Sequence, residues 1–122
     1  MGKRVLVVDD EPNIVMSLEF LMKRAGFEVA VARDGAEALR ALEGAPPDLV
    51  LLDVMMPEFD GYEVCERLRQ KPEWRDTKII MLTARGRDAE RERGLSLGAD
   101  AYVTKPFSTR DLVERAKAML EG

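Results

Sequence analysis

Short apolar runs recur along the chain at intervals typical of strands that alternate with helices. They lie at residues 5–8, 29–31, 49–52, 79–82 and 101–103. The runs at 5–8, 49–52 and 79–82 are four residues long and are continuously apolar, without alternation between apolar and polar residues. Such runs are typical of strands that helices cover on both faces, as in a parallel sheet. The pattern therefore predicts five strands in a parallel arrangement.

The segments between these runs carry apolar residues at the spacing of amphipathic helices. Asp34, with Glu37 three residues later, resembles the capping box that starts a helix, and Ser108 with Asp111 is a similar start for the last one. The predicted helices cover about residues 14–25, 34–42, 61–70, 88–97 and 108–120. The segment 88–97 is mostly polar and contains Gly94, so we expect this helix to be marginal and able to move.

Strand and helix alternate with short connections, which predicts an open, doubly wound α/β domain with five helices around a five-stranded parallel sheet. A length of 122 residues suits one domain, so we expect residues 1–122 to form a single unit. The sequence has no apolar stretch of the roughly 20 residues that a membrane span needs, and its first residues lack a secretory signal. We therefore expect a cytoplasmic protein without a membrane partner.

Charge and composition exclude several classes of function. The chain has 19 Lys and Arg against 23 Asp and Glu, a net charge of −4, which argues against direct nucleic-acid binding by this domain. It has no histidine and one cysteine, so it cannot assemble a zinc cluster, a Ser-His-Asp or Cys-His catalytic centre, or an internal disulfide. Any chemistry must use carboxylates, hydroxyls, lysines or a hard metal ion.

Such residues follow the predicted strands. Asp9 and Asp10 come after the first run, Asp53 after the third, Thr83 after the fourth and Lys105 after the fifth. Because parallel strands end at one edge of the sheet, where ligands bind, we expect these side chains to lie together. All but Asp53 also have a simpler interpretation: Asp9 and Asp10 could cap the following helix, Thr83 could be an ordinary strand-end residue and Lys105 a solvated surface lysine. For Asp53 a function is favoured, because an unpaired carboxylate beside a buried strand is costly unless something binds it. Their coincidence at one edge favours a functional site.

The chemistry that this set permits is narrow. Close carboxylates repel one another and attract a cation, and an all-oxygen acidic site suits Mg²⁺ better than zinc or copper. An aspartate beside Mg²⁺ and a lysine can attack phosphorus and form an acyl phosphate. The residues therefore predict Mg²⁺-dependent phosphoryl transfer onto an aspartate.

Four motifs support a more specific interpretation. They are VLVVDDEP at 5–12, DLVLLDVMMPEFDG at 48–61, IIMLTAR at 79–85 and GADAYVTKPF at 98–107. In this order and spacing the chain resembles the receiver domain of two-component response regulators, with the flavodoxin-like fold of the chemotaxis regulator. The resemblance implies a signalling module, not a conventional enzyme, although self-phosphorylation and autodephosphorylation are expected. A sensor histidine kinase would supply the phosphoryl group.

The resemblance also implies roles for the residues at the metal and phosphoryl sites. Asp53 would be the phosphoacceptor. Asp10 and Asp53 would bind Mg²⁺ directly, together with the backbone carbonyl of Met55, while Asp9 would hold a metal-bound water. Lys105 would pair with a phosphoryl oxygen.

Further residues would carry the switch. Thr83 would hydrogen-bond the phosphoryl group once it arrives, and Tyr102 matches the aromatic residue that turns inward as the threonine moves. The bond between Lys105 and Pro106 is expected to be cis, which would place the lysine at the site. Phosphorylation would then change the surface formed by the fourth helix, the fifth strand and the fifth helix.

The output surface shows a further, incomplete resemblance. Arg91, Asp111 and Arg115 resemble the charged set by which receivers of the winged-helix transcription-factor subfamily form homodimers. The acidic residue usual beside the tyrosine is Ala101 here, with Asp100 next to it. A merely solvated charged face therefore stays open as an alternative. An output domain or partner protein would lie outside this chain.

Two other functions are alternatives for this set of residues. A haloacid-dehalogenase-like phosphatase also uses an aspartyl nucleophile, Mg²⁺ and lysine, but it needs Asp-x-Asp after the first strand, where this chain has Asp9, Asp10 and Glu11. A receiver-like interaction module that works without phosphorylation is the main alternative. The chain has all five residues that the phosphorylated receiver needs at its site, which argues against this module: Asp9, Asp10, Asp53, Thr83 and Lys105.

Overall fold

The computed structural model describes residues 3–44, 46–54, 61–74, 76–84, 98–105 and 107–121. One five-stranded, fully parallel sheet has the strand order β2-β1-β3-β4-β5. The strands are β1 (Arg4–Val8), β2 (Glu28–Ala32), β3 (Leu49–Asp53), β4 (Lys78–Ala84) and β5 (Ala101–Lys105). The α-helices in the described part of the chain are α1 (Pro12–Arg24), α2 (Gly35–Gly44), α3 (Gly61–Gln70) and α5 (Thr109–Glu121), and the short 3₁₀ helix η1 (Pro72–Trp74) follows α3. This strand order is the flavodoxin-like one, so the predicted fold class is confirmed.

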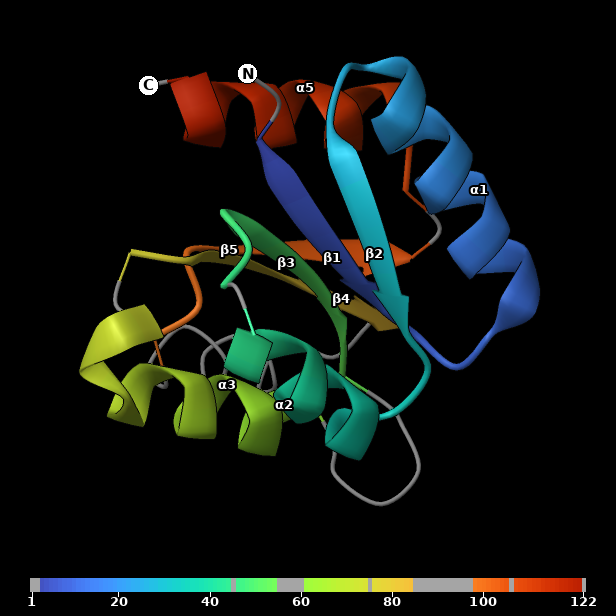
Figure 1. Ribbon diagram of the computed structural model, residues 1–122. Helices are drawn as coiled ribbons and strands as arrows, with labels where there is room; N and C mark the ends of the chain where they lie inside the picture. The colour runs from blue at the N-terminus through green and yellow to red at the C-terminus, as the bar shows by residue number, and fades with distance from the viewer. Residues whose placement is uncertain are drawn as a thin grey trace.

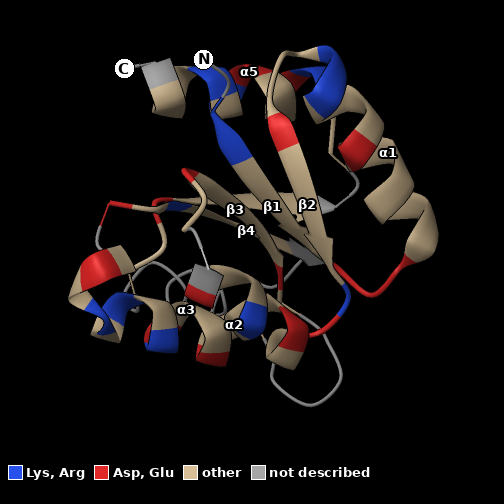
Figure 2. Cartoon of the chain, in the orientation of Figure 1, with Lys and Arg blue, Asp and Glu red and all other residues tan. Residues whose placement is uncertain are grey.

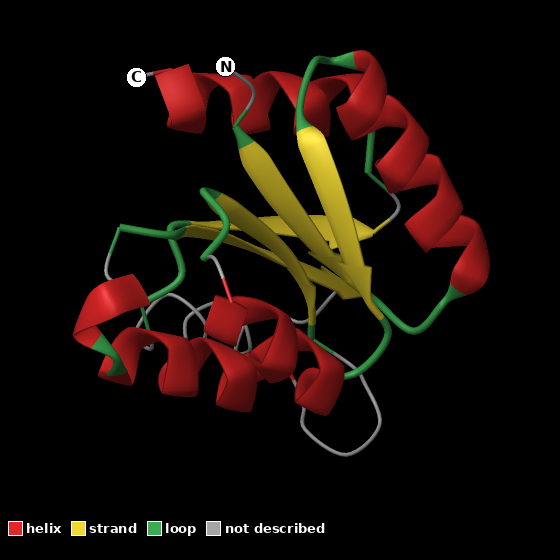
Figure 3. Cartoon of the chain, in the orientation of Figure 1, coloured by secondary structure: helices red, strands yellow, loops and turns green. Residues whose placement is uncertain are grey.

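The helices form two layers, one on each face of the sheet. Helices α1 and α5 cover one face, and α2 and α3 cover the other (Figure 1; Figure 3). Alternate strand residues feed the two cores: Val5, Val7, Leu49 and Leu51 pack towards α1 and α5, whereas Leu6, Val8, Val50 and Leu52 pack towards α2 and α3. Every residue of β3 is buried, as its continuous apolar run predicts.

Local sequence signals explain where the helices begin and end. Pro12 occupies the first turn of α1, where its missing N–H costs no hydrogen bond. The Asp34 carboxylate accepts a hydrogen bond from the Glu37 N–H at 2.8 Å, which confirms the capping role predicted for the start of α2. After α1 the chain turns at Gly26, whose φ of 100° lies in the left-handed region that favours glycine. The fourth helix predicted at 88–97 falls outside the described residues.

Strand register fixes what lies at the carboxyl edge of the sheet. Asp53 at the end of β3 is level with Leu82 of β4, and Ala84 is level with Lys105 at the end of β5. The ends of β1, β3, β4 and β5 therefore meet along one edge, as the sequence predicts. None of the described helices combines the length and the apolar composition that crossing a bilayer requires.

Candidate functional site

Three carboxylates gather at the carboxyl edge of the sheet. Asp9 and Asp10 follow β1, and Asp53 ends the adjacent strand β3. Oxygen atoms of the three carboxylates lie within 4.8 Å of one another. Asp9 is fully buried and Asp53 is 5% exposed, whereas Asp10 is exposed to solvent. The acidic loop between β1 and α1 can be followed in red in Figure 2.

The backbone around Asp9 holds this residue in place. Its N–H donates to the Ala32 carbonyl at the end of β2 (3.1 Å), and its carboxylate accepts from the Glu11 N–H (2.9 Å). Glu11 is the N-cap residue of α1 and makes no side-chain cap of its own. The simpler interpretation of the acids as helix caps thus accounts for one hydrogen bond of Asp9. It does not explain why Asp53, from another strand, adjoins the same carboxylates.

The arrangement is electrostatically costly and suits a cation. Two like unit charges separated by 4 to 5 Å repel by about 3 to 4 kcal/mol at the effective dielectric constant near a protein surface. Asp9 and Asp53 are both buried, so water screens the repulsion between them less than it does at the exposed Asp10. Hard carboxylate oxygens open to solvent on the Asp10 side are ligands that Mg²⁺ prefers, because this ion keeps several of its waters. The donor set therefore fits Mg²⁺.

Backbone positions bring two further predicted residues to the same edge. Thr83 in β4 is level with Thr104, and Lys105 ends β5 level with Ala84. Thr83 is thus one residue beyond Leu82, which is level with Asp53. The structure describes the backbone of these two residues and not their side chains.

Some of the remaining predicted site residues lie within the described part of the chain and others do not. Met55, Arg91 and Pro106 lie outside the described residues, and with Pro106 the predicted cis bond does too. Tyr102 in β5 is half-buried and packs against the core between the sheet and the helices α2 and α3. Its hydroxyl is buried and has no hydrogen-bond partner within the described part of the chain.

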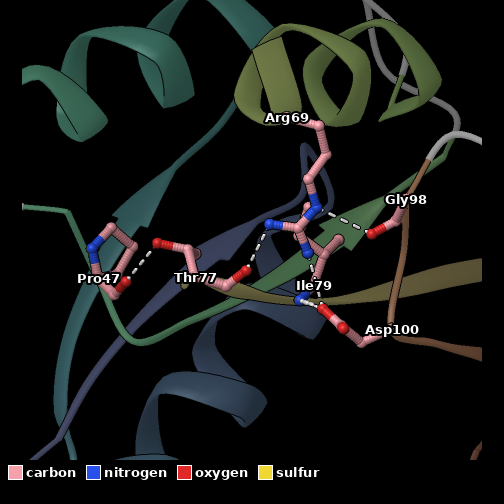
Figure 4. A network of polar contacts seen from close by, with 6 residues as sticks. All are labelled: Pro47, Arg69, Thr77, Ile79, Gly98 and Asp100. Carbon is pink, nitrogen blue, oxygen red and sulfur yellow. Dashed lines mark hydrogen bonds and ion pairs between the residues drawn. The ribbon is translucent and has the colours of Figure 1, made fainter. Parts of the chain in front are cut away.

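Asp100 belongs to a polar network at the opposite, amino end of β4 and β5 (Figure 4). Its carboxylate accepts from the Arg69 guanidinium and from the Ile79 N–H, each at 2.8 Å. The same guanidinium donates to the carbonyls of Gly98 (2.9 Å) and Thr77 (2.7 Å). Asp100 is thereby engaged within its own chain, so it is a poor substitute for the acid missing at Ala101. Sequence reasoning missed this network, because its members are far apart in the chain and follow no periodicity.

The candidate interface residues on α5 are accessible. Asp111 and Arg115 are both exposed, and they line the same hollow as Tyr102 and Phe107. They lie beside β5, and their role at an interface stays a prediction.

Cys65 lies away from this chemistry. It is fully buried in α3, and burial raises the pKa of its thiol to about 11. A thiol with this pKa stays protonated near neutral pH, which agrees with its prediction as a core residue.

Known proteins are similar to this chain in both sequence and fold. Residues 5–117 match the family model of the response regulator receiver domain. The chain is 49% identical over 120 residues to the alkaline phosphatase synthesis transcriptional regulatory protein PhoP of Bacillus subtilis, covering 98% of this chain and 49% of that protein. It thus spans about half the length of this curated relative.

Solved structures agree closely. A protein described as a response regulator from Chloroflexus aurantiacus superposes with a TM-score of 0.95 at 38% identity, over 100% of both chains. The BeF3-activated DrrB receiver domain superposes with a TM-score of 0.90 at 33% identity, also over 100% of both chains. The family match, the relative and the shared fold together show that this chain belongs to the response regulator receiver domains of two-component systems.

Proposed function

We propose that this chain is the Mg²⁺-dependent phosphoacceptor switch of a cytoplasmic two-component system, with residues 1–122 as one receiver domain. The observation that carries the proposal is the meeting of three carboxylates, from the ends of two adjacent strands, within 4.8 Å. Asp53 is the phosphoacceptor, and a sensor histidine kinase supplies the phosphoryl group. The DrrB receiver domain, which has the same fold, is known in a BeF3-activated form.

The proposed mechanism assigns each residue one task. An oxygen of the Asp53 carboxylate attacks phosphorus; an acyl phosphate O–P bond forms, the P–N bond to the kinase histidine breaks, and the imidazole nitrogen keeps the electron pair and takes up a proton. Asp10, Asp53 and the Met55 carbonyl would hold Mg²⁺, and Asp9 would orient a water on it. The ion supplies charge neutralisation at the phosphoryl oxygens. Lys105 pairs with one of these oxygens.

The switch follows from the charge that arrives. Phosphorylation adds about −1.5 to −2 charge and strong acceptor oxygens. Thr83, on the strand next to Asp53, donates its hydroxyl to the phosphoryl group. Tyr102 then turns further inward from its half-buried position in β5. The surface formed by β5, α5 and the fourth helix predicted at 88–97 changes as a result.

The output of this switch requires an output domain or a partner protein that is not part of residues 1–122. The curated relative is a transcriptional regulatory protein and is about twice as long as this chain. We therefore place an output domain outside residues 1–122 and expect it, not this domain, to contact DNA. A homodimer formed through Arg91, Asp111 and Arg115 would bring two such output domains together.

The test is the intact mass of the protein after incubation with Mg²⁺ and acetyl phosphate. We expect one phosphoryl adduct on the wild type, and none on Asp53→Asn or after chelation of the metal. Asp10→Asn is expected to need much more Mg²⁺ for the same adduct. A folded wild-type protein that gains no adduct would refute the proposal and favour the module that works without phosphorylation.

A further inference from the structure

Gly61, the first residue of α3, lies against the end of β3. It is buried. A Cβ atom at this position would overlap the Asp53 carbonyl oxygen, and it would lie 2.9 Å from the Val54 Cα and 3.0 Å from the Asp53 carbonyl carbon. All three are backbone atoms, so none can turn aside as a flexible side chain could. A side chain at position 61 therefore requires the backbone of residues 53–54 to move.

Space, not backbone conformation, is the reason for glycine here. The glycines with positive φ in the described part of the chain are Gly26 and Gly98, and Gly61 has an ordinary helical conformation. Alanine favours a helix over glycine, so the sequence gives up helix propensity at this position. The close approach of α3 to β3 explains that choice.

Hydrogen bonds close the same junction. The Gly61 N–H donates to the Val54 carbonyl at 2.9 Å, and the Val54 N–H donates to the Leu82 carbonyl of β4 at 3.0 Å. The end of β3 is thus held from α3 and from β4 at the residue after Asp53. A displacement at this junction moves the Asp53 carboxylate relative to those of Asp9 and Asp10.

We infer that Gly61 is a positioning residue for the phosphoacceptor. By allowing α3 to contact the backbone of Asp53, it fixes the Asp53 carboxylate against the two acids that follow β1. This inference rests on the proposed function, because it takes the three carboxylates to be a Mg²⁺ site. Functional groups at such sites need to be held within about 0.5 Å, and a change in their supporting residues typically lowers metal affinity about 10- to 100-fold.

The experiment compares Gly61→Ala with Gly26→Ala, measuring Mg²⁺ binding by calorimetry and the melting temperature without metal. At Gly26 a Cβ has open space but a strained φ of 100°, beyond the end of α1 farther from the carboxylates. We expect Gly61→Ala to raise the Kd for Mg²⁺ about 10- to 100-fold. Gly26→Ala should lower the melting temperature and leave that Kd unchanged. A variant too unstable in buffer is measured with trimethylamine N-oxide, which strengthens burial, with wild type alongside.

Amide NMR spectra of the metal-free proteins separate this inference from the proposed function. We expect Gly61→Ala to shift the resonances of Asp9, Asp10 and Asp53, and Gly26→Ala to leave them in place. Wild-type protein that binds no Mg²⁺ would refute the metal site, and these spectra alone would then decide on Gly61. A folded Gly61→Ala variant with the wild-type Kd, or with unshifted resonances at the three acids, would overturn the positioning role.

Discussion

Replacing Arg69 by methionine removes the donor at the centre of the polar network in Figure 4 and keeps most of the side chain's apolar stem. The guanidinium joins three segments: the end of α3, the residue before β4 and the turn that leads into β5. It donates to the carbonyls of Thr77 and Gly98 and to the Asp100 carboxylate, at 2.7, 2.9 and 2.8 Å. The substitution leaves these acceptors without that donor in a partly buried place.

The expected cost follows from these contacts. Each hydrogen bond from the guanidinium to a backbone carbonyl contributes about 1 to 1.5 kcal/mol. This value does not exceed the low end of the range for a charged donor, because water reaches the site. The side chains of Arg69 and Asp100 are 22% and 31% exposed, so their ion pair is partly screened and contributes about 0.5 to 1 kcal/mol. We therefore expect Arg69→Met to lower the free energy of unfolding by about 3 kcal/mol.

Urea denaturation followed by circular dichroism measures this change, with the m-value checked for two-state behaviour. Asp100→Asn can keep an acceptor for the Ile79 N–H and loses only the charge, so it should cost about 1 kcal/mol or less. Arg67→Met is the matched control on the same helix: the Arg67 side chain is 52% exposed and its ion pair with Glu63 spans 3.9 Å, so the effect should stay within about 0.5 kcal/mol. A loss for Arg69→Met no larger than that of this control would refute the reasoning.

Three further predictions test the cluster and the cores. Asp10→Asn should raise the melting temperature in EDTA, since it removes a like charge from the cluster, and should abolish most of the stabilisation that added Mg²⁺ gives the wild type; thermal melts with and without metal measure both. Leu51→Ala, at a fully buried position in the central strand, should cost about 2 to 5 kcal/mol in urea denaturation. Because burial raises the pKa of Cys65 to about 11 from 9.0, the unfolded chain loses this proton first as pH rises. Stability should therefore fall by about 2 kcal/mol between pH 9 and 11, and Cys65→Ala should lack that loss.

The sequence predicts strands where burial and backbone pairing coincide. The runs of β1 and β3 are found within a residue of their predicted ends, since strands covered on both faces must be apolar throughout. The ends of β4 and β5 extend beyond the predicted runs to Ala84 and Lys105. There the backbone ladder continues after the apolar pattern stops, with Thr83 level with Thr104. Hydrophobic pattern reports burial, so it misses pairing that continues into polar residues.

The same limit applies to the candidate site. Asp9, Asp10 and Asp53 could be predicted to meet, because each follows a recognisable strand and parallel strands share an edge. Arg69 and Gly61 could not be found in this way. Arg69 acts through backbone carbonyls that leave no trace in the sequence, and Gly61 is required by a backbone contact that only three-dimensional packing creates.

The amino and carboxyl ends of the sheet differ in the charged groups that they gather. At the amino end of β4 and β5, Asp100 is held by a guanidinium and a backbone N–H, so its charge is compensated by fixed groups that resist movement. At the carboxyl end, three like charges are concentrated within 4.8 Å, two of them on buried residues. An arrangement of this kind is sensitive to any bound cation or added phosphoryl group, because each changes a large electrostatic energy. Under the proposed function, a change at Asp53 would therefore alter the carboxyl end of the sheet while the Arg69–Asp100 network holds the amino end of β4 and β5 in place.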